Sequence, residues 1–156
     1  MPRGWRGRSR RHDIPELVRA PAVGDLPPAK LQAGARYFGT TVSGDWRDRV
    51  VSRGLGARST ARISLSEEGL DVIRLAGSFR IPAGRLRGAT HEQGLAGKGV
   101  PPQGLLVVTW QHGSYLLDTG FRLSVAKLEQ GASAGTTEAH HVWVRSISKI
   151  AREHSG

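Results

Sequence analysis

The chain contains no cysteine, and this absence excludes disulfide bonds, thiolate zinc sites and cysteine nucleophiles together. Long apolar runs are also missing. The longest, Leu105–Trp110, is interrupted by Thr109, whereas a helix that crosses a bilayer needs about 20 consecutive apolar residues. No apolar stretch follows the charged start, so we expect no secretory signal. At 156 residues the chain is too short for a two-domain enzyme or a large α/β barrel, which leaves one ordinary domain with a tail.

Acidic residues are scarce relative to basic ones: 13 Asp and Glu stand against 23 Lys and Arg, giving a net charge of +10. The segment 1–12 holds five arginines and no acid, so half of the net charge lies there. Such a segment repels itself and cannot bury apolar surface, which is typical of an interaction arm for nucleic acid or anionic lipid. The predicted anion-binding residues are Arg3, Arg6, Arg8, Arg10 and Arg11.

Two further zones follow the basic arm of residues 1–12. Residues 13–34 contain four prolines among Ala, Val and Leu, and because proline fixes φ and removes a donor we expect an extended spacer. From residue 35 to residue 156, short strand-like segments are separated by glycine-containing turns. The seven candidate strands are Tyr37–Val42, Thr60–Leu65, Leu70–Leu75, Ser78–Ile81, Gly88–Glu92, Leu105–Trp110 and Tyr115–Asp118.

Seven strands at a spacing of roughly 8–12 residues favour an antiparallel sandwich or barrel, and hence a mainly β fold. The C-terminal segment has a different period. Over residues 137–153, apolar side chains recur three or four residues apart on one stripe: Trp143, Val144, Ile147, Ile150 and Ala151. We therefore expect one amphipathic helix that packs against the barrel through this stripe.

Two glycine-rich motifs match catalytic signatures in letters only. Gly131–Gly135 has the G-x-S-x-G pattern around Ser133, but no buried strand precedes it and the chain is too short for the hydrolase fold. Gly94–Gly99 lacks the glycine and the hydroxyl residue that a P-loop needs around its Gly-Lys pair. The six histidines form no ligand set, because the adjacent His140 and His141 point about 100° apart on a helix. We predict no catalytic residues, no metal site, no cofactor and no enzymatic activity.

Two segments between strands are candidate recognition loops. Trp46 and Arg47 combine an aromatic ring with charge and can meet a ligand or a partner. Large aromatics usually bury most of their area, however, and this favours Trp46 as a cover for the barrel end. Lys98 lies in the second loop and can contact a phosphate as a point charge, although a plain connection between strands is the commoner role.

Several motifs occur together, in the same order as in one known family. They include Gly44-Asp45-Trp46, Gly54–Ser59, Phe79–Ala83, Gly104–Trp110 and Leu117–Arg122. In this order they resemble the actinobacterial PH-like domain proteins, which are small membrane-anchored proteins described as export or transporter-like membrane proteins. The resemblance covers about residues 35–123 and, loosely, the last helix. It implies a pleckstrin-homology-like fold: a seven-stranded, bent antiparallel barrel capped by one C-terminal amphipathic helix.

The resemblance also implies a location and a class of partner. Family members have an N-terminal transmembrane helix, then a basic stretch and a proline-containing spacer, and this sequence begins at the equivalent of the basic stretch. We therefore expect the domain at the cytoplasmic face of the cell membrane, in contact with an anionic membrane surface, an unidentified membrane protein, or both. Residues Ser124–Gly135 resemble an insertion before the helix. The family contributes no catalytic residues.

Two functions fit these observations. The first is a non-enzymatic PH-like binding or scaffold module at the membrane, since such a barrel offers a rim of loops and a sheet edge to a ligand or peptide. The second is sequence-independent nucleic-acid binding by the basic arm and the barrel, through salt-sensitive phosphate contacts. The second is disfavoured because only 6% of the residues are aromatic and no strand interleaves aromatic with basic residues. Neither function defines an oligomeric state.

Overall fold

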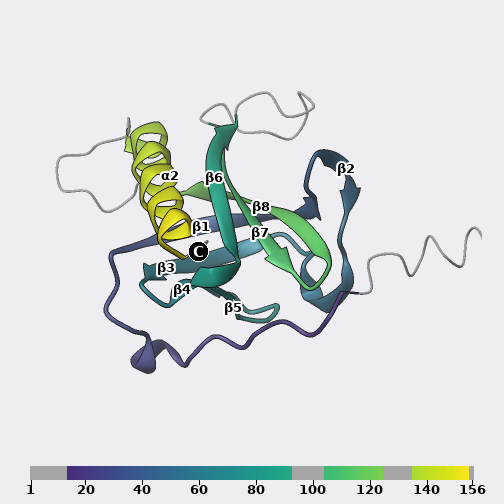
Figure 1. Cartoon of the computed structure of the whole chain (residues 1–156), viewed down its shortest axis with the longest axis horizontal. Helices are drawn as coiled ribbons and strands as arrows, with labels where there is room; N and C mark the ends of the chain where they lie inside the picture. The colour runs from purple at the N-terminus through teal and green to yellow at the C-terminus, as the bar shows by residue number, and fades with distance from the viewer. Residues whose placement is uncertain (1–13, 93–103, 125–134, 155–156) are drawn as a thin grey trace, which may run out of the picture.

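The computed structural model describes residues 14–92, 104–124 and 135–154, and within these ranges the chain forms eight strands, one α-helix and three short 3-10 helices (Figure 1). The strands are β1 (Leu31–Val42), β2 (Asp45–Arg49), β3 (Ser59–Ser66), β4 (Gly69–Ile73), β5 (Phe79–Pro82), β6 (Leu86–Glu92), β7 (Leu105–His112) and β8 (Tyr115–Leu123). The helices are η1 (Val23–Asp25), η2 (Ser52–Gly54), η3 (Ala83–Arg85) and α2 (Gly135–His154). Among the described helices, none is long and apolar enough to cross a membrane.

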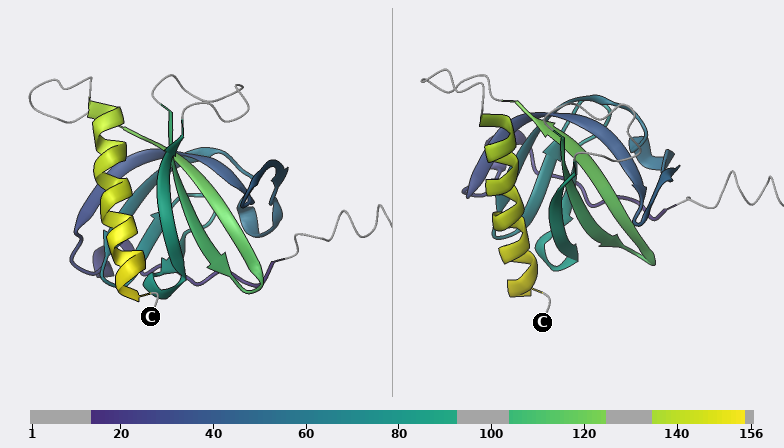
Figure 2. Two further views of the ribbon diagram at one scale, coloured as in Figure 1. Left: turned by 45° about the horizontal axis from the view of Figure 1, so that its top comes forward. Right: turned by 90° about the horizontal axis from the view of Figure 1, so that it is seen from above.

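The strands pair antiparallel in the order β5-β4-β3-β1-β8-β7-β6, and β2 extends the sheet beside β1. Because β1 pairs with both β3 and β8, it joins the two halves into one bent sheet (Figures 1 and 2). Alternation along the strands sets the two faces: in β3, Ile63 and Leu65 are buried while Arg62 is exposed. The expected mainly β fold, with seven strands along the main path and one C-terminal helix, is confirmed.

The core lies between the curved sheet and α2. Phe79 stacks on Trp110 with 5.9 Å between ring centroids, and Tyr37 meets Phe121 edge-on at 5.8 Å. Helix α2 runs alongside β6 in both views of Figure 2. Its predicted stripe is buried against the sheet at Trp143, Ile147, Ile150 and Ala151. A helix with this one apolar face is stabilised mainly by such packing.

The N-terminal third differs from the expected organisation. β1 begins at Leu31, so residues 31–34 of the expected spacer pair with β3. Ile14, near the start of that spacer, is fully buried in the core. Val18 accepts a hydrogen bond from Arg80 N at 2.8 Å, so the spacer also covers the free edge of β5. The prolines remove amide donors, but the carbonyl groups remain as acceptors, and this is why a proline-rich segment can still dock.

Two smaller differences affect the loops. Residues 45–49, expected to form a loop, make strand β2 beside the end of β1. Strand β4 ends at Ile73 rather than Leu75, because Gly77 N donates to Arg74 O and the Ser78 hydroxyl bonds the Arg74 amide, which turns the chain. Leu75 is therefore on a turn and not on a strand.

Candidate functional site

Three segments meet at the end of the barrel where β1, β4 and β7 end. They are η2 with its flanks (51–56), the β4–β5 turn (74–78) and the β7–β8 turn (112–115), and together we name them the rim. η2 lies so close to the β4–β5 turn that a Cβ atom on Gly54 would be 3.0 Å from the carbonyl oxygen of Ala76. Arg53 has φ of 58°, a conformation uncommon outside glycine. The two loops are thus held in one fixed arrangement.

Arg74 lies beneath these loops with its guanidinium inside the protein. The residue is 6% exposed, its Nε donates to Gly77 O at 2.8 Å, and Cζ lies 4.4 Å from the Tyr37 ring centroid and 5.4 Å from that of Phe79. In the part of the chain that the structure describes, its two terminal nitrogens have no hydrogen-bond acceptor. Burial lowers the pKa of Arg74, yet an arginine stays charged in proteins. The rim therefore contains a buried cation stabilised by aromatic faces.

A chain of hydrogen bonds crosses the core below Arg74. Trp110 Nε1 donates to Thr119 Oγ1 at 2.9 Å, the hydroxyls of Thr119 and Thr40 are 2.8 Å apart, and that of Tyr37 is 2.7 Å from Thr40 and 2.6 Å from Leu55 O. An indole N–H can only donate and a carbonyl can only accept, so both ends of the chain have fixed roles. Each hydroxyl therefore donates onward, from Trp110 towards Leu55. The chain ties β7, β8 and β1 to the loop after η2.

Residues 14–18, which we name the strap, connect the loops of the rim. Arg53 Nε donates to Ile14 O at 3.1 Å, and His112 Nε2 lies 2.8 Å from Pro15 O. A carbonyl only accepts, so the proton of this bond is on His112 Nε2. The strap thus links η2 to the β7–β8 turn, and residues 1–13 join the described structure at Ile14, beside the rim (Figure 1).

The loops of the rim also expose apolar side chains. Leu75, on the β4–β5 turn, is 102% exposed, and Val51, immediately before η2, is 70% exposed. The two loops contact each other where Gly54 approaches Ala76. Cationic Arg53 is on η2, two residues after Val51. An exposed leucine and valine beside basic residues is the combination that surface-bound membrane proteins use, with apolar groups in the acyl boundary and cations at the headgroups.

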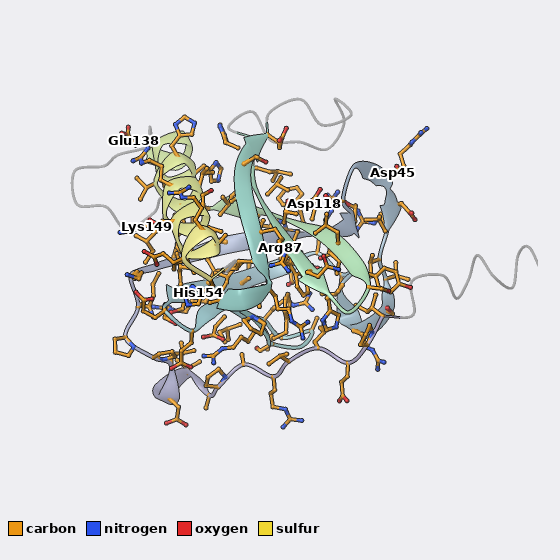
Figure 3. The ribbon with its side chains drawn as sticks, viewed as in Figure 1. Asp45, Arg87, Asp118, Glu138, Lys149 and His154 are labelled. Carbon is orange, nitrogen blue, oxygen red and sulfur yellow. The ribbon has the colours of Figure 1, made fainter. Side chains whose placement is uncertain are left out.

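Most of the contact residues predicted from the sequence lie outside the described part of the structure. Arg47 is exposed on β2, which projects from the barrel and carries Asp45 at its start (Figure 3). Trp46 belongs to the same strand, and its side chain lies outside the described residues. Lys98 falls outside them too, as do the five arginines of the arm and Ser133. The structure therefore describes Arg47 alone among the predicted contact side chains.

His91 on β6 comes together with the adjacent His140 and His141 of α2, about fifty residues later in the chain. His91 Nδ1 lies 3.2 Å from His141 Nε2, and the His91 ring centroid is 5.1 Å from that of His140. His140 is fully buried and its Nε2 accepts from Leu123 N at 3.1 Å, so this histidine fastens α2 to β8. Across the described ranges no group of three or more His, Cys, Asp or Glu side chains is placed to hold a metal ion.

Sequence reasoning did not find the rim or the strap. Arg74 fell within the expected strand Leu70–Leu75 and was given no role of its own, and its burial involves η2, which comes twenty residues earlier in the chain. Leu75 continued the alternation of the same strand and so was assigned to it. The Gly77-Ser78 pair beyond it was the available signal for a turn, because both residue types favour turns.

A bent antiparallel sheet of seven main strands, capped by one C-terminal helix and presenting its loops at one end, defines a pleckstrin-homology-like domain. Residues 14–148 match the family described as bacterial PH domain-like, and the chain belongs to this family. The match begins at Ile14 and so includes the strap. No curated protein matches the chain. PH-like domains are typically non-catalytic binding modules, and this supports a binding or scaffold role in general terms.

Proposed function

We propose that the protein is a non-enzymatic binding module that docks on the cytoplasmic, anionic face of the cell membrane through its rim and its basic arm. The observation that carries the proposal is the position of the apolar tips. Leu75 and Val51 protrude at the end of the barrel where Ile14 connects to the arm. One surface thus combines apolar insertion with cationic attraction.

The magnitudes favour two signals acting together. Each base near an anionic leaflet contributes about 1 kcal/mol, so the five arginines of the arm supply at most ~5 kcal/mol. Burying a leucine side chain fully contributes about 1.5–3 kcal/mol. Either contribution alone gives weak, reversible attachment to the membrane, whereas the two together give stable attachment that is still sensitive to salt. A membrane protein that holds the domain in this orientation would add a third contribution.

The test is cosedimentation of the full chain with anionic and with neutral liposomes. We expect salt-sensitive binding to the anionic liposomes only. Replacing Leu75 and Val51 with aspartate should reduce binding about tenfold or more, because the lost burial of two apolar side chains exceeds 1.4 kcal/mol. Val23→Asp is the matched control, since Val23 is also apolar and 59% exposed but lies on η1, away from the rim (Figure 1).

A second part of the experiment tests the basic arm. Exchanging Arg3, Arg6, Arg8, Arg10 and Arg11 for serine should remove the salt sensitivity of liposome binding. Single-stranded RNA competes in the same assay. The membrane proposal is wrong if the Leu75 and Val51 variant binds liposomes like wild type. It is also wrong if RNA displaces the protein from liposomes at equal phosphate concentration, and nucleic-acid binding then takes its place.

A further inference from the structure

The outer face of the sheet carries three arginines on three adjacent strands and a fourth beside them. Arg36 lies on β1, Arg122 on β8 and Arg62 on β3, while Arg58 immediately precedes β3. All four are exposed, and Arg36, Arg122 and Arg62 point away from the core because the adjacent residues along their strands, Ala35, Leu123 and Ile63, are buried in it. Helix α2 packs on the core side. We name this surface the arginine face.

The sheet register places like charges directly together. Arg36 is the cross-strand partner of Arg122, and Arg62 pairs with Gly34, two residues along β1 from Arg36. Arg58 lies with Cζ 4.9 Å from the ring centroid of Phe38. Directly opposed like charges destabilise a sheet, by up to about 1 kcal/mol for one pair. The fold therefore tolerates an unfavourable arrangement at this place.

No acid among the described residues neutralises the arginine face. Asp118, on the outward side of β8, is four residues and so about 13 Å from Arg122, and it accepts a hydrogen bond from Thr109 instead. That distance exceeds the Debye length of about 8 Å at physiological ionic strength. Arg80 shows the contrast, because Asp71 binds it through two oxygens, at 2.7 and 3.0 Å, and Glu68 adds a third contact at 2.8 Å.

We infer that the arginine face is the docking surface for an acidic segment of a partner protein, rich in Asp and Glu. Planar guanidinium forks on neighbouring strands match a row of carboxylates, which would relieve the repulsion between Arg36 and Arg122. The choice of a protein over lipid rests on the proposed function. With the rim at the membrane, Arg122, the cross-strand partner of Arg36, is seven residues along β8 from Tyr115 of the β7–β8 turn, about 23 Å, where lipid charge is screened. Arg62 lies nearer to the rim, since it pairs with Ile73 at the end of β4.

Nucleic acid fits this face less well than an acidic polypeptide. Stacking surfaces for single strands present several aromatic rings, whereas Phe38 is the one aromatic residue that β1, β3 and β8 place among these arginines, and Arg58 already lies over its ring. Four cations are also fewer than the six to ten phosphate contacts that typically give strong backbone binding.

The test measures fluorescence anisotropy of a short labelled peptide of alternating glutamate and serine, titrated with the full chain. We expect salt-sensitive binding, and no binding of the glutamine–serine peptide. Arg36→Glu with Arg122→Glu should weaken binding about tenfold, since two attractive contacts become repulsive. The matched control is Arg85→Glu with Arg145→Glu, which makes the same change in net charge at exposed sites on η3 and α2 and should bind like wild type.

Stability provides an independent readout. Arg36→Thr and Arg122→Thr, singly, should raise the melting temperature by roughly 1–4 °C, because each removes the opposed charge. Liposome binding should be unchanged in the Arg36→Glu, Arg122→Glu variant, which separates this inference from the proposed function. The inference is overturned if the Arg36→Glu, Arg122→Glu variant and the Arg85→Glu, Arg145→Glu control lose peptide binding equally. It is also overturned if the Arg36→Glu, Arg122→Glu variant loses liposome binding as the Leu75 and Val51 variant does, or if RNA of equal charge binds the arginine face more tightly than the peptide.

Discussion

Tyr37 determines how the polar chain of the core responds to alkaline pH. Its hydroxyl donates to Leu55 O, and an ionised phenolate would have no proton to give. Burial raises the pKa of Tyr37 from 10.0 to about 12. The neutral form is therefore favoured in the folded state, and the stability linked to it is complete below pH 10, where the unfolded tyrosine is still protonated.

Between pH 10 and pH 12 the unfolded tyrosine ionises while the folded one does not, so unfolding becomes easier. We expect the free energy of unfolding to fall by roughly 2 kcal/mol through Tyr37 over this window. Denaturant titrations at several pH values measure it. Tyr37→Phe is the reference: at neutral pH it should cost about 1–3 kcal/mol for the unsatisfied groups, and its loss of stability above pH 10 should be shallower than that of wild type. Parallel curves for the two proteins would contradict the role of Tyr37.

Gly69 occupies a position that no side chain fits. It has φ of 136°, and a Cβ atom there would lie 2.8 Å from Ala83 N and closer still to Ile81 O on β5. Both obstacles are backbone atoms, so the sheet itself would have to move. Gly69→Ala should therefore destabilise the protein by about 3 kcal/mol or more.

Gly84→Ala is the control for this substitution, because a Cβ atom at Gly84 meets nothing within 4 Å and the residue does not need a left-handed backbone. Its melting temperature should stay within a few degrees of wild type. Thermal denaturation followed by circular dichroism compares the two variants. Equal melting temperatures for Gly69→Ala and Gly84→Ala would mean that the β4–β5 backbone can shift to accommodate a Cβ atom at little cost in stability.

At the scale of elements, Trp143 is the largest side chain by which α2 packs on the sheet. Trp143 is 3% exposed and lies on the stripe that packs against the sheet. Trp143→Ala should cost ~3–5 kcal/mol, because the indole leaves a cavity that the surrounding strands cannot close. Val144, partly buried beside it, is the control: Val144→Ala should cost less than half as much. A melting temperature insensitive to Trp143→Ala would show that α2 is not part of the core.

The elements differ in how far sequence predicts them, for physical reasons. β3 and α2 each bury one face, so their apolar residues repeat with the period of the element and both could be predicted. β2 has no such face: Asp45–Arg49 carries four charged side chains and is a strand because its backbone pairs with β1 across a register shift. Propensity contains no information about that pairing.

The candidate site was less predictable than the fold because its contacts are few and long-range. Arg74 is buried by η2, and Ile14 is fixed by a backbone carbonyl that accepts from Arg53, thirty-nine residues away. Neither contact leaves a periodic pattern. The predicted contact residues were instead the conspicuous charges and aromatics, of which Arg47 is exposed on β2 and the others lie outside the described side chains.

At the scale of the whole molecule, the strap decides where the folded domain begins. Ile14 is fully buried, Pro15 bonds to the β7–β8 turn, and Val18 covers the β5 edge, so the domain extends seventeen residues ahead of the first sheet strand. An uncovered β5 would present unpaired backbone groups to other chains. The proline-rich segment therefore belongs to the fold, although its composition is that of a linker.

Two truncations test this boundary. Removing residues 1–12 keeps every contact of Ile14, Pro15 and Val18, and we expect an unchanged melting temperature together with loss of salt-sensitive liposome binding. Removing residues 1–18 deletes the buried isoleucine and three hydrogen-bonding carbonyl groups, and should lower the free energy of unfolding by at least ~3 kcal/mol. It should also promote association through the exposed β5 edge, which size-exclusion chromatography detects. If the two truncated proteins melt at the same temperature and remain equally dispersed, the strap is a spacer after all and the domain begins at β1.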